Sequence, residues 1–259
     1  IHCPLDAGVQ IPLSAPSYSR AKNYTNYPIL KTMPDYEIIN NEELRMVKVN
    51  LNGEEVRSES GALHYMKGQL EMVSSFQGVG KLLKSIATSE KVFRPTYKGT
   101  GEIYFGPPSF DEYHILQLNN EMWVLDQGAY VCSDISVEIG AIMNKSVKSW
   151  FAGGEGVFQT SVQGTGTVVF KSPGPIEEIQ LNGETLTVDG RFAVAREGSL
   201  QFNTQLLGKT MMSKISGGEG FVNVISGTGK VLLAPVPTKW NTILDRNVMD
   251  LIPFLGSNN

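Results

Sequence analysis

The sequence predicts an all-β protein whose three tandem, pseudo-symmetric units, each sandwich-like or barrel-like, surround a pseudo-threefold axis. The main observation is the phrase Gly-Thr-Gly, which occurs at intervals of 65 and 63 residues, beginning at Gly99, Gly164 and Gly227. Apolar and polar residues alternate after each copy, the pattern of a half-buried strand. Many short strands separated by glycine-rich corners favour a sandwich or a barrel.

A second repeated phrase gives the length of the unit. Leu51, Leu118 and Leu181 each precede Asn-Gly or Asn-Asn, and they stand 48, 46 and 46 residues before the corresponding Gly-Thr-Gly. Two spacings that agree over the same period indicate a threefold internal duplication. We expect one β domain over residues 41–238, with units at about 44–106, 113–172 and 176–235.

The repeated small residues predict local geometry. The asparagine-glycine steps suit a tight hairpin turn, because both residues tolerate positive φ. The Gly-Thr-Gly sequences are expected to open strands at a sharp bend or bulge; a phosphate-binding loop would instead open onto a helix N-terminus. A phenylalanine stands six residues before each copy, and we expect equivalent burial of Phe93, Phe158 and Phe221.

Three segments fall outside the repeat. Residues 1–40 are rich in proline, tyrosine and asparagine and predict an extended N-terminal arm, which we expect to lie on a neighbouring chain, with its own barrel as the alternative. A short helix is expected within Ser75–Thr88. The tail, residues 239–259, is helical between Asn241 and Gly256, with apolar residues on one face. We expect it to cover its own barrel, with a partner as the alternative.

Composition limits the class of function. The 259 residues carry a net charge of −4, and the basic residues are scattered, so no nucleic-acid partner is expected. No apolar run is long enough for a transmembrane span, although peripheral membrane association is compatible with the sequence. The chain begins at Ile1, which allows a cleaved targeting peptide and leaves a cytoplasmic or an organellar location open. Cys3 and Cys132 are expected to be free thiols, with a bridge between them as the alternative.

The chemical motifs are incomplete. Gly80 and Lys81 match part of a phosphate-binding loop, but Leu82 occupies the position of the hydroxyl residue that binds magnesium. No Gly-x-Ser-x-Gly sequence marks a nucleophilic serine. The tryptophans occupy unequal places in the units and are expected in the core or an interface; they are Trp123, Trp150 and Trp240.

Histidines and acidic residues offer no site either. The three histidines, His2, His64 and His114, are far apart in the sequence and supply no metal-ligand set. Glu155 and Glu219 recur in the sequence Gly-Gly-Glu-Gly, and Glu90 holds the corresponding place in the first unit; a carboxylate repeated in this way is expected to be structural. We therefore expect no catalytic, cofactor-binding or metal-binding residues, no cofactor and no enzymatic activity.

The sequences "GGEGVFQTSVQGTGTVVF" and "GGEGFVNVISGTGKVLL", with "NLNGEEVRSESGALHYMKGQLEM" and "GVGKLLKS", resemble the altered inheritance of mitochondria protein 24 family over about Leu44 to Pro237. The resemblance implies an all-β fold with units similar to the tryptophan-binding RNA attenuation protein. Fungal members are mitochondrial proteins tied to inner-membrane organisation, and bacterial members have no known biochemical function. The family has no established catalytic residues to carry over.

These observations favour a non-catalytic assembly or scaffold protein that acts through protein-protein contacts. Its expected partners are proteins, either further copies of the chain or the subunits of a larger or membrane-associated complex. The alternative is a module that binds a small ligand or RNA, by analogy with the attenuation protein. The acidic composition counts against RNA, and fold analogy alone is a weak argument for function.

Overall fold

The computed structural model describes residues 33–41, 44–73, 94–106, 111–143, 158–189, 192–206, 221–236 and 238. The chain divides into two compact parts, Ile1–Lys31 and Thr32–Asn259, and every described residue belongs to the second part. All regular elements of the described residues are strands, which confirms the all-β class. The helices expected within Ser75–Thr88 and Asn241–Gly256, and the first 32 residues of the arm, lie outside the described residues.

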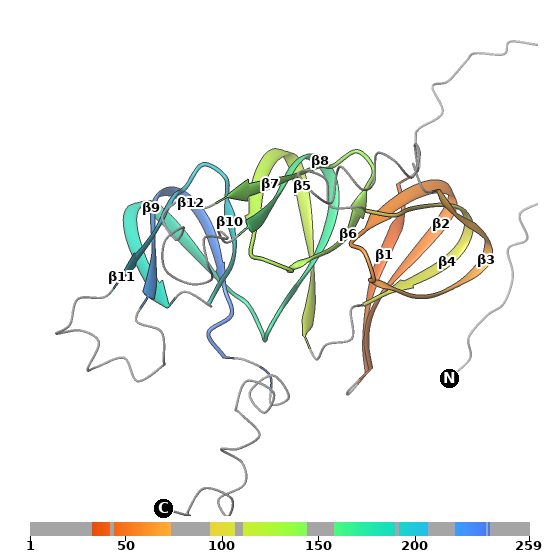
Figure 1. Ribbon diagram of the computed structural model, residues 1–259, viewed down its shortest axis with the longest axis horizontal. Coiled ribbons are helices and arrows are strands. Elements are labelled where there is room, and N and C mark those ends of the chain that lie inside the picture. The colour runs from red at the N-terminus through yellow and green to blue at the C-terminus, as the bar shows by residue number, and fades with distance from the viewer. Residues whose placement is uncertain are drawn as a thin grey trace, which may run out of the picture. The chain divides into compact units, whose positions relative to one another are not determined.

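The twelve strands of the described residues fall into three consecutive groups of four, coloured from orange through green to blue in Figure 1. Unit one contains β1 (Asp35–Asn41), β2 (Leu44–Ser58), β3 (Leu63–Val73) and β4 (Thr96–Phe105). Strand β1 begins within the stretch assigned to the arm, because residues 35–41 pair antiparallel with the start of β2. Strand β4 lies between β2 and β3.

Units two and three repeat the order of β2, β3 and β4, with the strand equivalent to β3 broken in two. Unit two contains β5 (Glu112–Leu125), β6 (Tyr130–Asp134), β7 (Glu138–Met143) and β8 (Phe158–Ser172). Unit three contains β9 (Glu177–Asp189), β10 (Ala193–Glu197), β11 (Gln201–Leu206) and β12 (Phe221–Leu233). Strands β6 and β7 both pair with β8, and β10 and β11 both pair with β12, so each pair together takes the place that β3 holds in unit one.

The strand register repeats with the sequence. In every unit the anchor leucine faces the second glycine of Gly-Thr-Gly, and the pairs are Leu51 with Gly101, Leu118 with Gly166, and Leu181 with Gly229. A backbone hydrogen bond also recurs at 2.8 Å, from Gly106 to Ala62, from Lys171 to Ala129, and from Ala234 to Phe192. The sequence duplication is therefore also a duplication of strand pairing.

The predicted hairpin turns after the leucines are wrong. Gly53, Asn120 and Gly183 do have positive φ, as expected for these positions. They lie inside β2, β5 and β9, however, where the register shifts opposite Gly-Thr-Gly and forms a bulge. Gly-Thr-Gly likewise lies inside a strand rather than at its start. The bulge prediction holds, and its effect is to bend two paired strands that continue on both sides.

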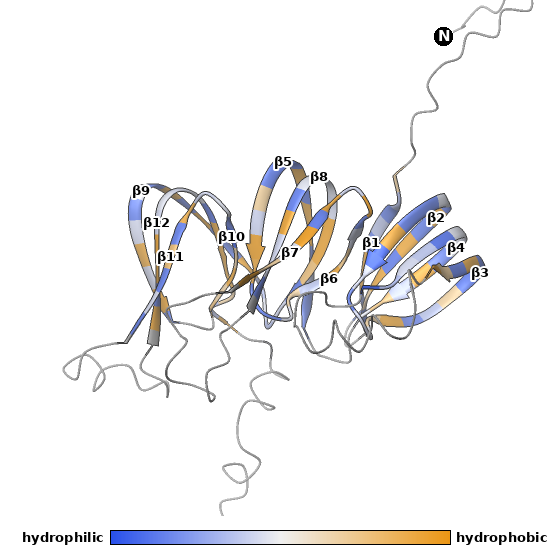
Figure 2. Ribbon diagram, turned by 45° about the horizontal axis from the view of Figure 1, so that its top comes forward, coloured by the Kyte–Doolittle hydropathy of each residue, from blue (hydrophilic) through white to orange (hydrophobic). Residues whose placement is uncertain are grey.

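Apolar and polar residues alternate along β2, as the hydropathy colouring in Figure 2 shows. The inward residues form three core clusters, one for each unit. Val131 and Cys132 of β6 also enter the core of unit one, and Val194 and Ala195 of β10 enter the core of unit two. The cores of units one and two are thus completed by the unit that follows.

One antiparallel sheet connects the units. Strand β6 pairs with the end of β2, and β10 pairs with the end of β5. The order β11-β12-β10-β5-β8-β6-β2-β4-β3 begins and ends on different strands, so the sheet is open. Strand β3 ends this order and pairs only with β4 among the described strands, and β9, which lies off this order, pairs only with β12.

Candidate interaction surface

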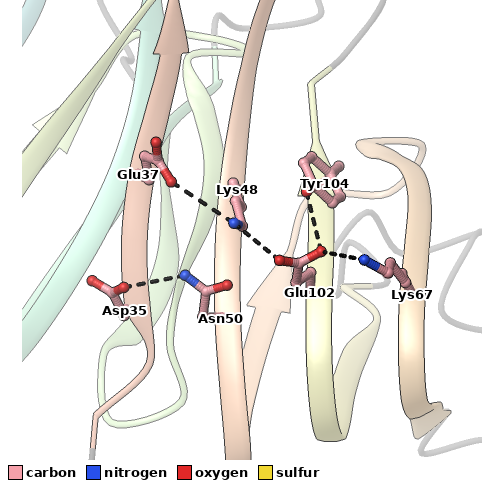
Figure 3. Close-up of polar contacts among 7 residues, drawn as sticks. All are labelled: Asp35, Glu37, Lys48, Asn50, Lys67, Glu102 and Tyr104. Carbon is pink, nitrogen blue, oxygen red and sulfur yellow. Dashed lines mark hydrogen bonds and ion pairs between the residues drawn. The ribbon is translucent and has the colours of Figure 1, made fainter.

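A ladder of charged groups crosses the outward face of unit one. Lys48 Nζ of β2 lies 3.0 Å from Glu102 Oε1 of β4 and 4.0 Å from Glu37 Oε2 of β1 (Figure 3). Lys67 Nζ of β3 lies 3.6 Å from Glu102 Oε2, and the Tyr104 hydroxyl donates to the same carboxylate at 3.3 Å. The ladder therefore links all four strands of the unit.

The electrostatics of the ladder favour its charged state. The hydrogen bond with Lys48 lowers the pKa of Glu102, and the same bond raises the pKa of Lys48. Both side chains remain partly open to water, where an ion pair adds little stability. Because the central carboxylate already has two cations and a hydroxyl as partners, it links neighbouring strands and is no free general base.

Strand β3 presents apolar side chains beyond this ladder. Most of its residues are exposed, and Tyr65, Met66, Met72 and Val73 are among the exposed large hydrophobic residues of the described part. Tyr65 stacks on Tyr104 with the ring centroids 4.3 Å apart. An exposed edge strand with apolar side chains and unpaired backbone groups is a template for pairing with another chain.

The junction of β2 with β6 contains buried polar groups. Asp134 of β6 accepts a hydrogen bond from the Tyr36 hydroxyl at 2.8 Å and from the Thr167 amide at 2.6 Å. The Tyr130 hydroxyl donates to the Arg57 carbonyl at 3.2 Å. These bonds satisfy groups that would be costly to bury alone. They connect β1 and β2 of unit one with β6 and β8 of unit two.

Burial changes the ionisation of this junction. Burial is the main cause that raises the pKa of the Tyr36 hydroxyl, with Cys132 and Asp134 adding to it. Burial also raises the pKa of the Tyr130 hydroxyl and that of the Cys132 thiol. Cys132 is a free thiol, fully buried in the core of unit one. A neutral buried thiol is a poor nucleophile, so its role here is packing.

The junction of β5 with β10 contains a buried cation. Arg196 Nη1 of β10 donates to Gln159 Oε1 at 3.1 Å, and the guanidinium carbon lies 4.1 Å from the ring centroid of Phe202. Burial lowers the pKa of Arg196 to about 10, against the opposing effect of Asp126. Trp123 of β5 is buried in the core of unit two, and the core is one of the two places expected for the tryptophans.

The other candidate residues named from the sequence do not form a site among the described residues. His114 Nε2 lies 2.7 Å from Ser172 Oγ beside the Phe170 ring, and burial lowers the pKa of this histidine. Across the described ranges, no group of three histidine, cysteine or acidic residues is arranged to hold a metal ion. His64 is an exposed residue of β3. The side chains of Phe158 and Phe221 lie outside the described part of the chain, as do the remaining candidates, Cys3, His2, Gly80, Lys81, Leu82, Glu90, Phe93, Trp150, Glu155, Glu219 and Trp240.

Sequence reasoning missed the importance of β3. The strand contains no striking motif, since "HYMKGQLEM" mixes apolar and polar residues without a clear period. The difference lies in the segments equivalent to Gly68 in units two and three, which form turns. In these turns the Val137 amide donates to the Asp134 carbonyl, and the Leu200 amide donates to the Glu197 carbonyl. Alignment of the three units would have identified β3 as the one that continues unbroken.

The strand order and the repeated register define a class: all-β proteins built from tandem β units joined edge to edge. Within this class the chain belongs to the family described as mitochondrial biogenesis AIM24, whose model matches residues 36–236. The resemblance predicted from the glycine-rich phrases is confirmed.

Two comparisons with proteins of Streptococcus pyogenes agree with this assignment. An uncharacterized protein of serotype M6 is 24% identical over 227 residues, which cover 80% of this chain and 91% of that protein. A crystal structure of a protein from the same species matches with a TM-score of 0.64 at 25% identity, covering 79% of this chain and 94% of the other. In the described part of this chain, no helix is both long and apolar enough to cross a membrane.

Proposed function

We propose that this chain is a non-catalytic assembly protein that acts through protein-protein contacts as a subunit of a larger or membrane-associated complex. The observation that carries the proposal is the outer edge of β3, which has no partner strand among the described residues and presents Tyr65, Met66, Met72 and Val73. Proteins avoid leaving such an edge open to water, because it pairs readily with other chains.

The charge ladder supports the same proposal. Backbone pairing with β4 over residues 63–73 presents the edge of β3 in a fixed conformation, and the ladder adds the contact of Lys67 with Glu102 across the same two strands. A preformed edge loses less conformational entropy on binding than a flexible segment does. The description of the family model refers to mitochondrial biogenesis, a process rather than a reaction, and is compatible with an assembly role.

The proposed architecture places the three units about a pseudo-threefold axis. Its support is the identical pairing of leucine with glycine in each unit. Superposition of the units tests it: rotations near 120° about a common axis are expected, and unrelated rotations would restrict the symmetry to the sequence and the local register.

Size-exclusion chromatography with light scattering tests the function. The full chain is expected to elute in a particle heavier than one 28.4-kDa chain. Replacement of Tyr65, Met66, Met72 and Val73 by serine should reduce the mass to that of one chain, because the edge loses its apolar contact area. Ile115→Ser is the matched control, since Ile115 is an exposed apolar residue on β5 and should not affect the mass.

The same samples separate the proposal from its alternative. Native mass spectrometry and the ratio of absorbance at two ultraviolet wavelengths would detect a stoichiometric small ligand or RNA. A monomer that carries such a ligand would contradict the assembly role. It would instead support a ligand-binding or RNA-binding module.

A further inference from the structure

The chain joins its own units twice by the same junction. Residues 56–58 of β2 pair antiparallel with residues 132–134 of β6, and residues 123–125 of β5 pair antiparallel with residues 195–197 of β10. These segments occupy equivalent positions, since both first members begin five residues after the anchor leucine. Each second member follows the bulge that faces the end of β8 or β12.

Units one and three each carry one unused half of this junction. Counting from the anchor leucine, residues 186–188 of β9 are equivalent to 56–58 and 123–125. Counting from the bulge between Leu63 and Tyr65, residues 65–67 of β3 are equivalent to the segments of β6 and β10. No described strand pairs with the outer edge of either segment.

Burial distinguishes the used halves from the unused ones. Cys132 and Ser133 of β6 are completely buried by their contact with unit one. Their counterparts on β3, Tyr65 and Met66, are 49% and 42% exposed. On the other end, Thr187 is exposed, whereas its counterpart Val124 is buried. The β3 segment thus carries a surface that the chain covers wherever a unit precedes, and the β9 segment one that it covers wherever a unit follows.

The three cores show the same asymmetry. The core of unit one receives Val131 and Cys132 from the next unit, and that of unit two receives Val194 and Ala195. The core cluster of unit three contains residues of unit three alone. In unit one, Tyr65 holds the position equivalent to Cys132 and Ala195, and it lies on β3, the last strand of the sheet order. Unit three therefore lacks a contribution that β3 is placed to give to another copy.

We propose that a second copy of this chain docks β3 against β9, continuing the sheet from one molecule to the next. The register follows from the two internal junctions: Lys67 faces Leu186, Met66 faces Thr187 and Tyr65 faces Val188. This inference rests on the proposed assembly function and names its partner. The contact is head-to-tail, because β3 and β9 are different surfaces, and such contacts generate closed rings or open filaments.

Charges placed on the two edges test the proposal in the full chain. Wild-type protein is expected to form species of two or more copies in light scattering. Met66→Lys blocks the β3 edge and Thr187→Lys blocks the β9 edge, so each variant should fall to 28.4 kDa. Both side chains are exposed, and unchanged circular dichroism confirms that each variant folds. Ile115→Lys is the matched control, because Ile115 is an exposed apolar residue of β5 that takes no part in a junction.

Mixing the two blocked variants gives the sharper result. The Met66→Lys chain retains an intact β9 edge and the Thr187→Lys chain an intact β3 edge, so the mixture should form a 1:1 dimer that grows no further. A chain carrying both Met66→Lys and Thr187→Glu should recover the wild-type mass, because opposite charges then face each other across the strands. Recovery would confirm the register as well as the partner.

The failures are distinguishable. If Met66→Lys reduces the mass and Thr187→Lys leaves it unchanged, β3 binds another surface, which overturns this inference and leaves the assembly function standing. A mixture without the 1:1 dimer, together with no recovery in the double variant, overturns it too. If the wild-type chain has the mass of one copy at every concentration and carries no other protein, both the inference and the proposed function fail.

Discussion

The first glycine of each Gly-Thr-Gly sequence has the same backbone conformation but different surroundings. Gly99, Gly164 and Gly227 have φ of +131°, +119° and +120°, a region that favours glycine. A Cβ atom on Gly99 would overlap the Gln69 carbonyl oxygen of β3. On Gly227 the nearest atom would be Leu200 Cδ2 at 3.5 Å, an ordinary contact. Glycine is needed at all three positions for conformation, and at Gly99 also for space.

Alanine at these positions separates the two causes. Gly227→Ala should lower the free energy of unfolding by about 1–3 kcal/mol, because the backbone is strained for any other residue. Gly99→Ala should cost roughly 1–3 kcal/mol more, since β3 and β4 must also move apart. Urea denaturation measures both. Equal losses would mean that β3 yields to the new methyl group at no cost.

At the scale of elements, the junction of β2 with β6 depends on groups that stay neutral. Burial raises the pKa of Tyr36 and Tyr130 above the ordinary value near 10, and that of Cys132 above 9.0. In the unfolded chain these groups lose their protons as the pH passes those ordinary values, while the folded chain retains them. The unfolded state then binds fewer protons, so stability falls as the pH rises above about 9. Arg196 acts in the opposite sense above pH 10, where its folded form loses its proton first.

Tyr36→Phe isolates one of these contributions. At neutral pH the variant should be less stable by about 1 kcal/mol, because Asp134 loses the hydrogen bond from the hydroxyl. Above pH 10 the wild type should lose stability faster, by up to about 1.4 kcal/mol per pH unit, so the gap narrows. Urea midpoints of both proteins between pH 7 and pH 11 measure the difference in stability. The contribution of Arg196 is the same in both proteins and does not affect this difference. A constant gap would mean that the Tyr36 hydroxyl ionises as readily in the folded state as in the unfolded one.

At the scale of the whole molecule, the chain divides after Lys31, and every described strand lies in the part from Thr32 to Asn259. Deletion of residues 1–34 removes no residue of β1, so the circular dichroism spectrum should be unchanged. The assembled mass should nevertheless decrease, because the apolar residues of the arm are expected to lie on a neighbouring chain. Light scattering and circular dichroism of the truncated chain measure the two outcomes. Loss of the β spectrum would place the arm in the core, and an unchanged mass would remove its role in assembly.

The sequence alone determined the fold class, the threefold duplication and the family, because these depend on local spacing and on residue type. The anchor leucine pairs with the second glycine of Gly-Thr-Gly in every unit, as Leu51 does with Gly101, and the positive φ angles after the leucines fall on glycine or asparagine, which tolerate them. Periodicity could not reveal that Asn-Gly forms a bulge within β2 instead of a turn, since asparagine and glycine suit both conformations.

Only the tertiary structure decided where the candidate surface lies. Tyr65, Cys132 and Ala195 occupy equivalent places in the three units, yet Tyr65 is exposed and the other two are buried. Their burial depends on whether a preceding unit lies against them, which is a matter of strand order. Unit one has no preceding unit and unit three has no following one among the described units, so the outer edges of β3 and β9 are left without a described partner strand.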